Sequence, residues 1–383
     1  MKVAVNAEQL LYHSPGGIGR YTAQILSGLP RLFPDDQVVA FTARHPRRTV
    51  NAALRAAGVS DQATAGPATI LGLTRPVLYE SWLRFGRPRL PSSLDTDLVH
   101  APSVAVPPHP QVPLVVTVHD VASELFPESF PRRGRHFHRL GLRAAERRAD
   151  IVLTVSDASA ADIAEHTSIE PERIRVVHNG VEPMPLEQEH RARILRALGL
   201  TDRMYVLWLG SFEPRKGVGT ILAAMAELRR RRANPDVHLV VAGYAGWLED
   251  GLVDPADRAA LGDSLRQIGR VNEEELWALY GGAALFTFPS RYEGFGLPVV
   301  EAMSQGTPVV ASDIPAMREV SAGAAKLVSP SSPQAWVDAI EELLDDDGAR
   351  TRLAQAGVAR SRELTLESTL RGIRAVYAEV AGH

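Results

Sequence analysis

The stretch FPSRYEGFGLPVVEAMSQGTPVVAS (residues 288–312) places two glutamates, Glu293 and Glu301, eight positions apart around a Gly-Phe-Gly turn. Residues 284–290 (ALFTFPS) predict a buried strand. Pro298 then suits the first turn of a helix, because its missing N–H has no helical partner there. Glu293 therefore lies in a loop at the carboxyl end of a strand, and Glu301 lies about one turn into the next helix. The stretch reads as one strand–loop–helix unit of an α/β protein.

The same alternation of strand and helix runs through the chain in two series, which predicts two doubly wound α/β sheets. The expected strands are 2–6, 38–42, 114–119 and 151–156, then 204–210, 237–243, 284–290 and 307–312. The expected helices are 18–29, 75–85 and 134–149, then 217–232, 272–281, 298–305 and 333–345, with helical pattern over 348–380. We expect two Rossmann-like domains, 1–180 and 181–365, facing each other across a cleft, with 180–190 as the linker and 366–383 as a closing helix.

The composition narrows the class of protein. A chain of 383 residues exceeds what one hydrophobic core usually serves. Cysteine is absent, which removes disulfides and thiolate chemistry. No apolar run reaches the roughly 18 residues of a membrane span, and the chain enters a strand-like run at once. These features predict a cytoplasmic protein.

The charge is unevenly distributed along the chain. Residues 1–180 carry 20 Lys and Arg against 17 Asp and Glu, whereas the remainder carries 22 Lys and Arg against 28 Asp and Glu. The first half is thus the more basic one.

The chemistry of the opening stretch favours a nucleotide-sugar. Carboxylates accept hydrogen bonds from vicinal hydroxyls, and a nucleotide-sugar presents two such sets, on the ribose and on the hexose. The amides between Gly294 and Leu297, together with the helix N-terminus, suit phosphate or sugar oxygens. The competing interpretation is a capping glutamate followed by a solvated helix glutamate.

A second candidate site is WLGSFEPRKGVGTIL (208–222), where Arg215 and Lys216 follow a strand and precede a helix. The chain has only three lysines, so a lysine at such a junction stands out. A bidentate guanidinium beside a compact ammonium suits a diphosphate. The alternative is a chance pair of surface cations.

Four further motifs lie in the first half. Gly16 and Gly17 precede a helix and would let a phosphate approach the backbone, although the spacing is not that of a dinucleotide fingerprint. His119, in TVHD (117–120), ends a strand and could bond a sugar hydroxyl or a leaving phosphate, with Asp120 orienting it. The alternative is that His119 has a purely structural role.

Asn179 lies in a turn that could approach the cleft. Ser156 or Asp157 is expected to cap a helix.

The segment 131–149 contains seven arginines, two histidines and one acid, Glu146. It reads either as a basic amphipathic helix that contacts an anionic membrane or a lipid-diphosphate acceptor, or as a solvated helix face. No nucleic-acid partner is expected.

Taken in order, GGIGRY, TVHD, VSDASA, HNGV, GSFEPRKG, AGYAGW and the 288–312 stretch resemble the retaining glycosyltransferases of the GT-B fold, specifically glycosyltransferase family 4 with its E-x7-E motif. The resemblance covers nearly the whole chain. The forms EPRKG and GYAGW are closest to mannosyl- and rhamnosyltransferases of surface polysaccharide assembly. Gly217 stands where that subgroup often has asparagine.

The resemblance implies a role for each matching residue. Glu301 would bind the ribose, and Glu293 the 3- and 4-hydroxyls of the donor hexose. Arg215 and Lys216 would clamp the diphosphate, and Gly16 and Gly17 would approach its β-phosphate. The other implied donor contacts are His119 beside the sugar, the amides of Phe295, Gly296 and Leu297, and Val271 in the base-binding loop. Asp120 and Asn179 remain acceptor-side candidates.

These roles predict transfer by front-face attack, with the donor phosphate taking the proton of the acceptor hydroxyl. The donor is expected to be GDP-mannose, with UDP-, ADP- or dTDP-sugars as alternatives. The acceptor is a hydroxyl of a glycan, glycolipid or small molecule. No cofactor or metal is expected, because the two cations can take the place of Mg²⁺. A dinucleotide-dependent oxidoreductase would leave both glutamates and the Arg-Lys pair without a role, and a non-catalytic partner subunit would not be expected to keep them all.

Overall fold

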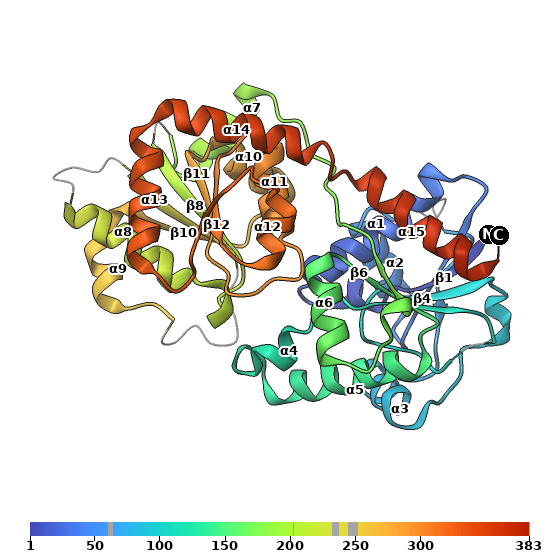
Figure 1. Ribbon diagram of the computed structural model, residues 1–383. Coiled ribbons are helices and arrows are strands. Elements are labelled where there is room, and N and C mark those ends of the chain that lie inside the picture. The colour runs from blue at the N-terminus through green and yellow to red at the C-terminus, as the bar shows by residue number, and fades with distance from the viewer. Residues whose placement is uncertain (60–63, 110, 202, 232–236, 244–251, 383) are drawn as a thin grey trace. The chain divides into compact units, whose positions relative to one another are not determined.

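The computed structural model describes residues 1–59, 64–109, 111–201, 203–231, 237–243 and 252–382 (Figure 1). The chain divides into two units. The first comprises Met1–Glu124, Arg132–His178 and Leu366–His383, and the second comprises Leu125–Pro131 and Asn179–Thr365. The sequence predicted boundaries at 180 and 365, whereas this division falls after His178 and Thr365 and places Leu125–Pro131 in the second unit. Each unit is built on its own parallel sheet.

The first sheet has the strand order β3-β2-β1-β4-β5-β6-β7, and every pair of neighbours is parallel. Its strands are β1 (Lys2–Asn6), β2 (Gln37–Thr42), β3 (Thr69–Ile70), β4 (Leu98–Ala101), β5 (Leu114–Thr117), β6 (Ile151–Thr154) and β7 (Ile174–Val176). The central strands are largely apolar because helices cover both faces of such a sheet.

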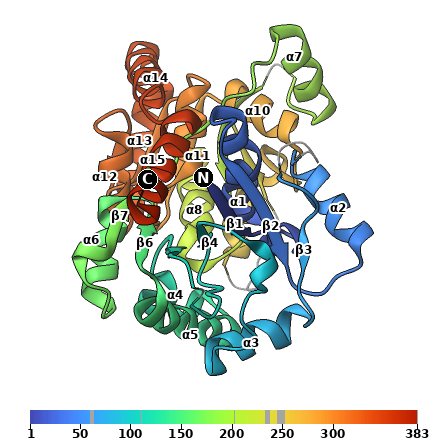
Figure 2. The ribbon, with the colours of Figure 1, turned by 90° about the vertical axis from the view of Figure 1, so that its right-hand side faces the viewer.

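Helices α1 (Gly16–Leu32) and α15 (Leu366–Ala381) pack together against one face of this sheet, so the last helix of the chain shares the first core (Figures 1 and 2). Gly28 of α1 allows this approach, since a Cβ there would lie 2.5 Å from Leu370 Cδ1. The remaining helices of the unit are α2 (Arg47–Ala56), α3 (Arg75–Phe85), α4 (Ala122–Leu125), α5 (Arg132–Arg148) and α6 (Asp157–His166).

The second sheet has the order β10-β9-β8-β11-β12-β13 and is also parallel throughout. Its strands are β8 (Met204–Leu209), β9 (Val237–Ala242), β10 (Leu265–Gly269), β11 (Leu285–Phe288), β12 (Val309–Ser312) and β13 (Lys326–Val328). Its helices are α7 (Gln188–Ala197), α8 (Val218–Arg231), α9 (Pro255–Leu261), α10 (Glu273–Gly282), α11 (Leu297–Ser304), α12 (Pro315–Ser321), α13 (Pro333–Asp345) and α14 (Asp347–Ser361). Trp208 and Trp336 lie buried in the core between this sheet, α8 and α13.

In both sheets the chain builds outward on one side and then returns to build on the other. The order reverses between β1 and β4 in the first sheet, and between β8 and β11 in the second. Such switch points leave a crevice at the carboxyl ends of the strands, which is where ligands bind in open α/β sheets.

The predicted alternation of strands and helices is confirmed, with corrections. The strands β3, β4, β7, β10 and β13 were not predicted. The strand expected over 114–119 ends at Thr117, which leaves His119 in the following loop. The helix expected from 18 begins at Gly16, so the glycine pair forms its first turn. The expected linker 180–190 contains the start of α7 at Gln188. Ser156 is the N-cap of α6, its side chain accepting from the Ser159 N–H.

Because α15 belongs to the first core, truncating its buried face should destabilise that core. Ile373 is fully buried there, and an isoleucine-to-alanine change of this kind costs about 2–4 kcal/mol. We expect Ile373→Ala to lower the free energy of unfolding by that amount in urea titrations followed by circular dichroism. Ala375→Ser, at an exposed position on the same helix, should change it by less than about 0.5 kcal/mol. Equal effects of the two variants would contradict the packing of α15.

Candidate active site

The loops that follow β8 and β11 meet at the switch point of the second sheet. After β8 the chain forms a short 3-10 helix, η5 (Pro214–Lys216), and Gly217 then turns into α8 with a φ of +68°. A Cβ at Gly217 would lie 2.3 Å from the Pro289 carbonyl oxygen, so only glycine allows this approach. The Arg291 N–H donates to the Arg215 carbonyl at 2.7 Å and joins the two loops.

This meeting of loops brings Arg215, Lys216 and Glu293 together. Lys216 Nζ donates to Glu293 Oε1 at 2.6 Å, and Arg215 Nη1 lies 3.4 Å from the same oxygen. Arg215 also donates to the Tyr292 carbonyl at 3.0 Å, and its Nε lies 3.5 Å from Glu213 Oε2. The side chains of Arg215, Lys216 and Glu293 are only 12%, 16% and 9% exposed, which rules out a chance pair of surface cations.

Opposing effects set the charge of Glu293. Burial would raise the pKa of its carboxyl, but the Lys216 ammonium and then the Arg215 guanidinium outweigh burial, so the pKa lies below 4.5. Glu293 is therefore a carboxylate at neutral pH. Because its pKa is depressed in the folded state, the ion pair stabilises the fold above pH 4.5 and loses this effect as the pH falls through the lowered value.

The Gly-Phe-Gly turn leads directly into α11. Gly296 is the N-cap of this helix with a φ of +102°, and a Cβ there would lie 2.4 Å from Met317 Cε. Phe295 is buried and Pro298 lies in the first turn, as the sequence predicted. The positive end of the helix macrodipole is thus fixed beside Glu293 and the two cations.

Glu301 is 2% exposed, and its Oε2 accepts from the Tyr280 hydroxyl of α10 at 2.9 Å. The alternative of a solvated helix glutamate is therefore wrong. Tyr280 was not recognised as a site residue, because nothing in the spacing between residues 280 and 301 marks a contact. Val271 lies half-buried between β10 and the Asn272 cap of α10.

His119 follows β5 in the first unit, and its orientation differs from the prediction. Its Nε2 lies 3.0 Å from the Pro102 carbonyl, and its ring meets the edge of Tyr21 at 4.9 Å between centroids. Asp120 does not supply the orienting bond; its Oδ1 caps the Ala122 N–H at 2.9 Å. Burial lowers the pKa of His119. Since a carbonyl only accepts, Nε2 carries the proton and Nδ1 of the neutral ring is left as an acceptor.

The remaining predicted residues are distributed between the units. Gly16 and Gly17 are exposed at the start of α1, and a Cβ at either would meet nothing within 4 Å among the described residues, so the backbone is open to a ligand. Asn179 is buried at the start of the second unit, whereas its fellow acceptor-side candidate Asp120 belongs to the first. The AGYAGW motif lies mostly outside the described residues.

The chain contains two Asp-x-Asp spacings, Asp95–Asp97 and Asp345–Asp347, and both lie apart from these residues in the sequence. Asp97 precedes β4 at the amino edge of the first sheet, where its carboxylate accepts from the Lys2 N–H at 2.7 Å. Asp346 caps α14 by accepting from the Ala349 N–H. The first pair therefore includes an aspartate that stabilises local backbone, and the residue between the members of the second pair does the same.

Comparisons with known proteins agree with this architecture. Residues 15–184 match the model described as Glycosyltransferase Family 4, and residues 191–360 match Glycosyl transferases group 1. The O-antigen chain mannosyltransferase B of Escherichia coli is 28% identical over 378 residues, covering 96% of this chain and 97% of that protein. A D-inositol 3-phosphate glycosyltransferase of a Nocardioides species is 30% identical over 244 residues, covering 60% of this chain and 53% of that protein. The chain thus spans about half the length of that relative.

Among solved structures, Anabaena Alr3699/HepE in complex with UDP and glucose matches with a TM-score of 0.75, covering 99% of this chain and 100% of that one. At 18% identity this likeness shows the fold alone. Two parallel Rossmann-like units with these matches define a glycosyltransferase enzyme of the GT-B fold. The chain belongs to the family 4, group 1 glycosyltransferases.

Removing the charge of Glu293 should strengthen nucleotide binding and slow sugar transfer. In Glu293→Gln the two cations lose their shared carboxylate, so we expect a nucleoside diphosphate to bind several-fold more tightly. Turnover of the nucleotide-sugar should fall, since the amide is the poorer acceptor for sugar hydroxyls. Isothermal titration calorimetry and nucleotide-release kinetics measure the two effects. Glu227→Gln, at an exposed carboxylate of α8, is the control. Weaker diphosphate binding by Glu293→Gln would contradict the prediction that Arg215 and Lys216 hold the diphosphate.

Proposed function

We propose that this protein is a retaining hexosyltransferase that uses a nucleotide-diphosphate sugar, with GDP-mannose as the favoured donor. The observation that carries the proposal is the buried cluster of Arg215, Lys216 and Glu293 at the switch point of the second sheet. It offers two cations for a diphosphate and one carboxylate for sugar hydroxyls. The mannosyltransferase name of the Escherichia coli relative supports mannose. UDP-, ADP- and dTDP-sugars are the alternative donors, and the Anabaena complex was solved with UDP.

In the proposed reaction the acceptor hydroxyl attacks the anomeric carbon on the face from which the diphosphate departs. The bond from that carbon to the phosphate oxygen breaks, and the departing oxygen takes the proton of the acceptor. Arg215, Lys216 and the N-terminus of α11 stabilise the charge that develops on the diphosphate, which takes the place of a metal ion. Nδ1 of the neutral His119 accepts a hydrogen bond from a hydroxyl of the donor sugar.

The other donor contacts complete the proposal. Glu301 binds the ribose diol, and its bond from Tyr280 holds the carboxylate in place. Gly16 and Gly17 approach the β-phosphate, Val271 lies by the base, and the amides of Gly294 to Leu297 bind phosphate and sugar oxygens. The acceptor is a hydroxyl of a glycan, glycolipid or small molecule, with Asp120 and Asn179 as candidate contacts. A cytoplasmic location stays a prediction.

A thermal-shift panel tests the donor site. With GDP, UDP, ADP and dTDP, each with and without Mg²⁺, we expect one nucleotide to raise the melting temperature independently of the metal. Lys216→Ala removes a charged donor to the phosphates and should lower the affinity for that nucleotide by roughly 10-fold or more. Glu301→Ala should also lower the affinity for that nucleotide. Lys326→Ala, at an exposed lysine of β13, is the matched control. A shift with NAD and with none of the four nucleotides would contradict the proposal.

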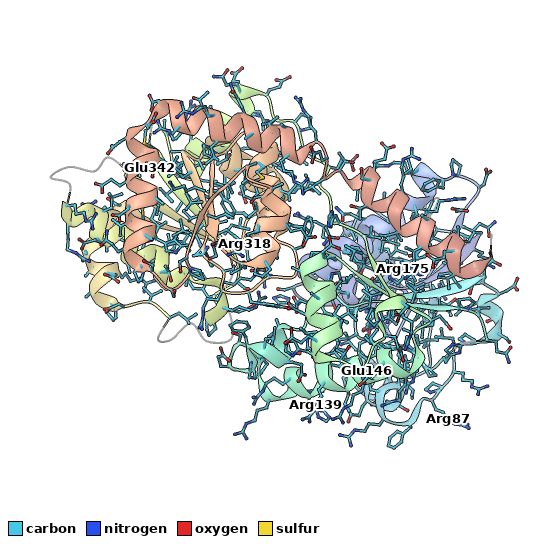
Figure 3. The ribbon with its side chains drawn as sticks, in the orientation of Figure 1. Arg87, Arg139, Glu146, Arg175, Arg318 and Glu342 are labelled. Atoms are coloured by element: carbon cyan, nitrogen blue, oxygen red, sulfur yellow. The ribbon has the colours of Figure 1, made fainter. Side chains whose placement is uncertain are left out.

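We also propose that the first unit rests on an anionic membrane. Exposed arginines follow α5 at positions 132, 133, 139, 143 and 147, and three more lie at the end of α3 at 84, 87 and 89. Arg84 lies 3.2 Å from His136, so the two helices present one continuous surface, which includes the labelled Arg87 and Arg139 (Figure 3). We call this surface the basic patch.

Apolar side chains lie beside the basic patch. Among the described residues, Val77, Phe85 and Met204 are the exposed large hydrophobics, and the first two are on α3 at 54% and 74% exposure. An exposed aromatic ring within a field of arginines suits the interface of an anionic bilayer. In the part of the chain that the structure describes, no helix has the length and apolarity needed to cross a membrane.

Vesicle co-sedimentation tests this contact. We expect binding to vesicles rich in phosphatidylglycerol, loss of binding at high salt, and little binding to phosphatidylcholine. Arg139→Gln should weaken binding about 5-fold, since each surface arginine contributes about 1 kcal/mol. Phe85→Ser should weaken it further, whereas Met204→Ser, at the exposed hydrophobic of the second unit, should not. Equal binding to both lipids would contradict the proposal.

A further inference from the structure

The first sheet has a switch point of its own, between β1 and β4, and the proposed donor clamp does not use it. The chain segments that follow β1, β2 and β4 converge there with the start of α3. Glu8 lies in the 3-10 helix η1 (Glu8–Leu11) after β1, His45 follows β2, and Arg75 opens α3. Ala105, after β4, accepts from Asn6 Nδ2 at 3.4 Å. A charged cluster thus lies on the β2 side of this switch point, at the carboxyl edge where α/β sheets bind ligands.

Glu8 is the centre of this cluster and is completely buried. Its Oε2 accepts from the Ala43 N–H at 2.9 Å, and its Oε1 lies 2.8 Å from His45 Nε2 and 4.0 Å from Arg75 Nε. Its own N–H donates to Asn6 Oδ1 at 3.1 Å. A buried carboxylate is costly unless it is paired in this way, so the surrounding loops are built around its charge.

Arg75 is the member of the cluster that can reach a ligand. Its side chain is 35% exposed, and its guanidinium carbon lies 4.0 Å above the ring of Tyr12. Its Nη1 is buried and has no hydrogen-bond partner among the described residues. Stacking on Tyr12 and attraction to Glu8 fix the plane of the guanidinium, so its remaining donors point in set directions. A buried donor without a partner is what a ligand oxygen would satisfy.

The aromatic residues around Arg75 suit a sugar ring. Tyr12 supplies a ring face, and the Tyr79 hydroxyl lies 3.5 Å from Asn6 Nδ2. Burial raises the pKa of both tyrosines, so both keep their O–H at neutral pH. The charge of Arg75 is already balanced by Glu8, which leaves no net positive charge for a phosphate. Guanidinium donors beside aromatic faces match the vicinal hydroxyls of an uncharged sugar.

We infer that Arg75, stacked on Tyr12 and charge-balanced by Glu8, binds an uncharged sugar ring of the acceptor at the switch point of the first sheet. This inference rests on the proposed transferase function and assigns its acceptor subsite. Glu8 and His45 are positioning residues, which act by holding Arg75 and the loop after β2. The subsite selects neutral sugars because Glu8 cancels the field that would attract a phosphorylated one.

The same contacts would also arise if the cluster only stabilised the loops, so the test measures selectivity. Two probes that differ in charge are methyl α-D-mannopyranoside and D-mannose 6-phosphate, with binding followed by saturation-transfer NMR. We expect the wild-type protein to bind the neutral probe in preference to the phosphorylated one. Arg75→Met keeps the packing on Tyr12 and loses the N–H donors, so it should lower the affinity for the neutral probe roughly 10-fold. Arg55→Met, at an exposed arginine of α2, should not.

Glu8→Gln keeps the size of the side chain and removes its charge. We expect this variant to gain affinity for D-mannose 6-phosphate, a change that a purely structural role would not produce. Lys216→Ala should leave mannoside binding intact, which separates this subsite from the donor clamp. The inference is overturned if the wild-type protein fails to bind the neutral probe, if it prefers the phosphorylated probe, or if Arg75→Met binds as the wild type does. A failed nucleotide panel with this mannoside pattern intact would count against the donor site alone.

Discussion

Parallel strands place one constraint on everything else in this protein. Because every strand of each sheet runs in the same direction, all the carboxyl ends lie along one edge, and each connection must cross back over a face of the sheet. Where the order of strands reverses, neighbouring loops leave in opposite directions and cannot cover the edge. The reversal at β8 and β11 brings Lys216 to Glu293 across 77 residues of chain.

At that edge, charge decides what the site can bind. Arg215, Lys216 and Glu293 form a cluster of largely buried side chains, and the two cations hold the Glu293 carboxylate ionised against the cost of burial. With Glu213 at 3.5 Å from Arg215, two cations face two carboxylates, and both cations carry N–H donors suited to a diphosphate. In the cluster of the first sheet, Glu8 offsets Arg75, and the aromatic rings nearby favour a neutral ligand. The carboxyl edges of the two sheets therefore present different chemistry.

The first unit also shows how the two ends of the chain share one core. Tyr377 of α15 bonds to His100 of β4 at 2.6 Å, and His100 reaches Thr117 at 2.8 Å. Thr117 in turn lies 3.2 Å from the hydroxyl of Tyr21, whose ring supports His119. Every member of this chain of bonds is buried, and such networks hold their side chains in place only when each group is satisfied. The final helix is thus joined to the histidine loop through polar contacts as well as apolar packing.

The sequence alone determined the fold class, the two series of strands and helices, and the donor-site residues that lie in contiguous motifs. Most central strands were recognisable because burial on both faces makes them largely apolar, but β4 was missed because it is only four residues long and contains His100. The four strands at the sheet edges, β3, β7, β10 and β13, were missed because each pairs on one side only and carries fewer apolar residues. Only the tertiary structure decided which polar groups meet. The Pro102 carbonyl, rather than Asp120, bonds to His119, and the Tyr280 hydroxyl bonds to Glu301. Glu8 lies beside both His45 and Arg75. These pairs join loops that are distant in the sequence, and no local pattern records a contact that the topology of a sheet creates.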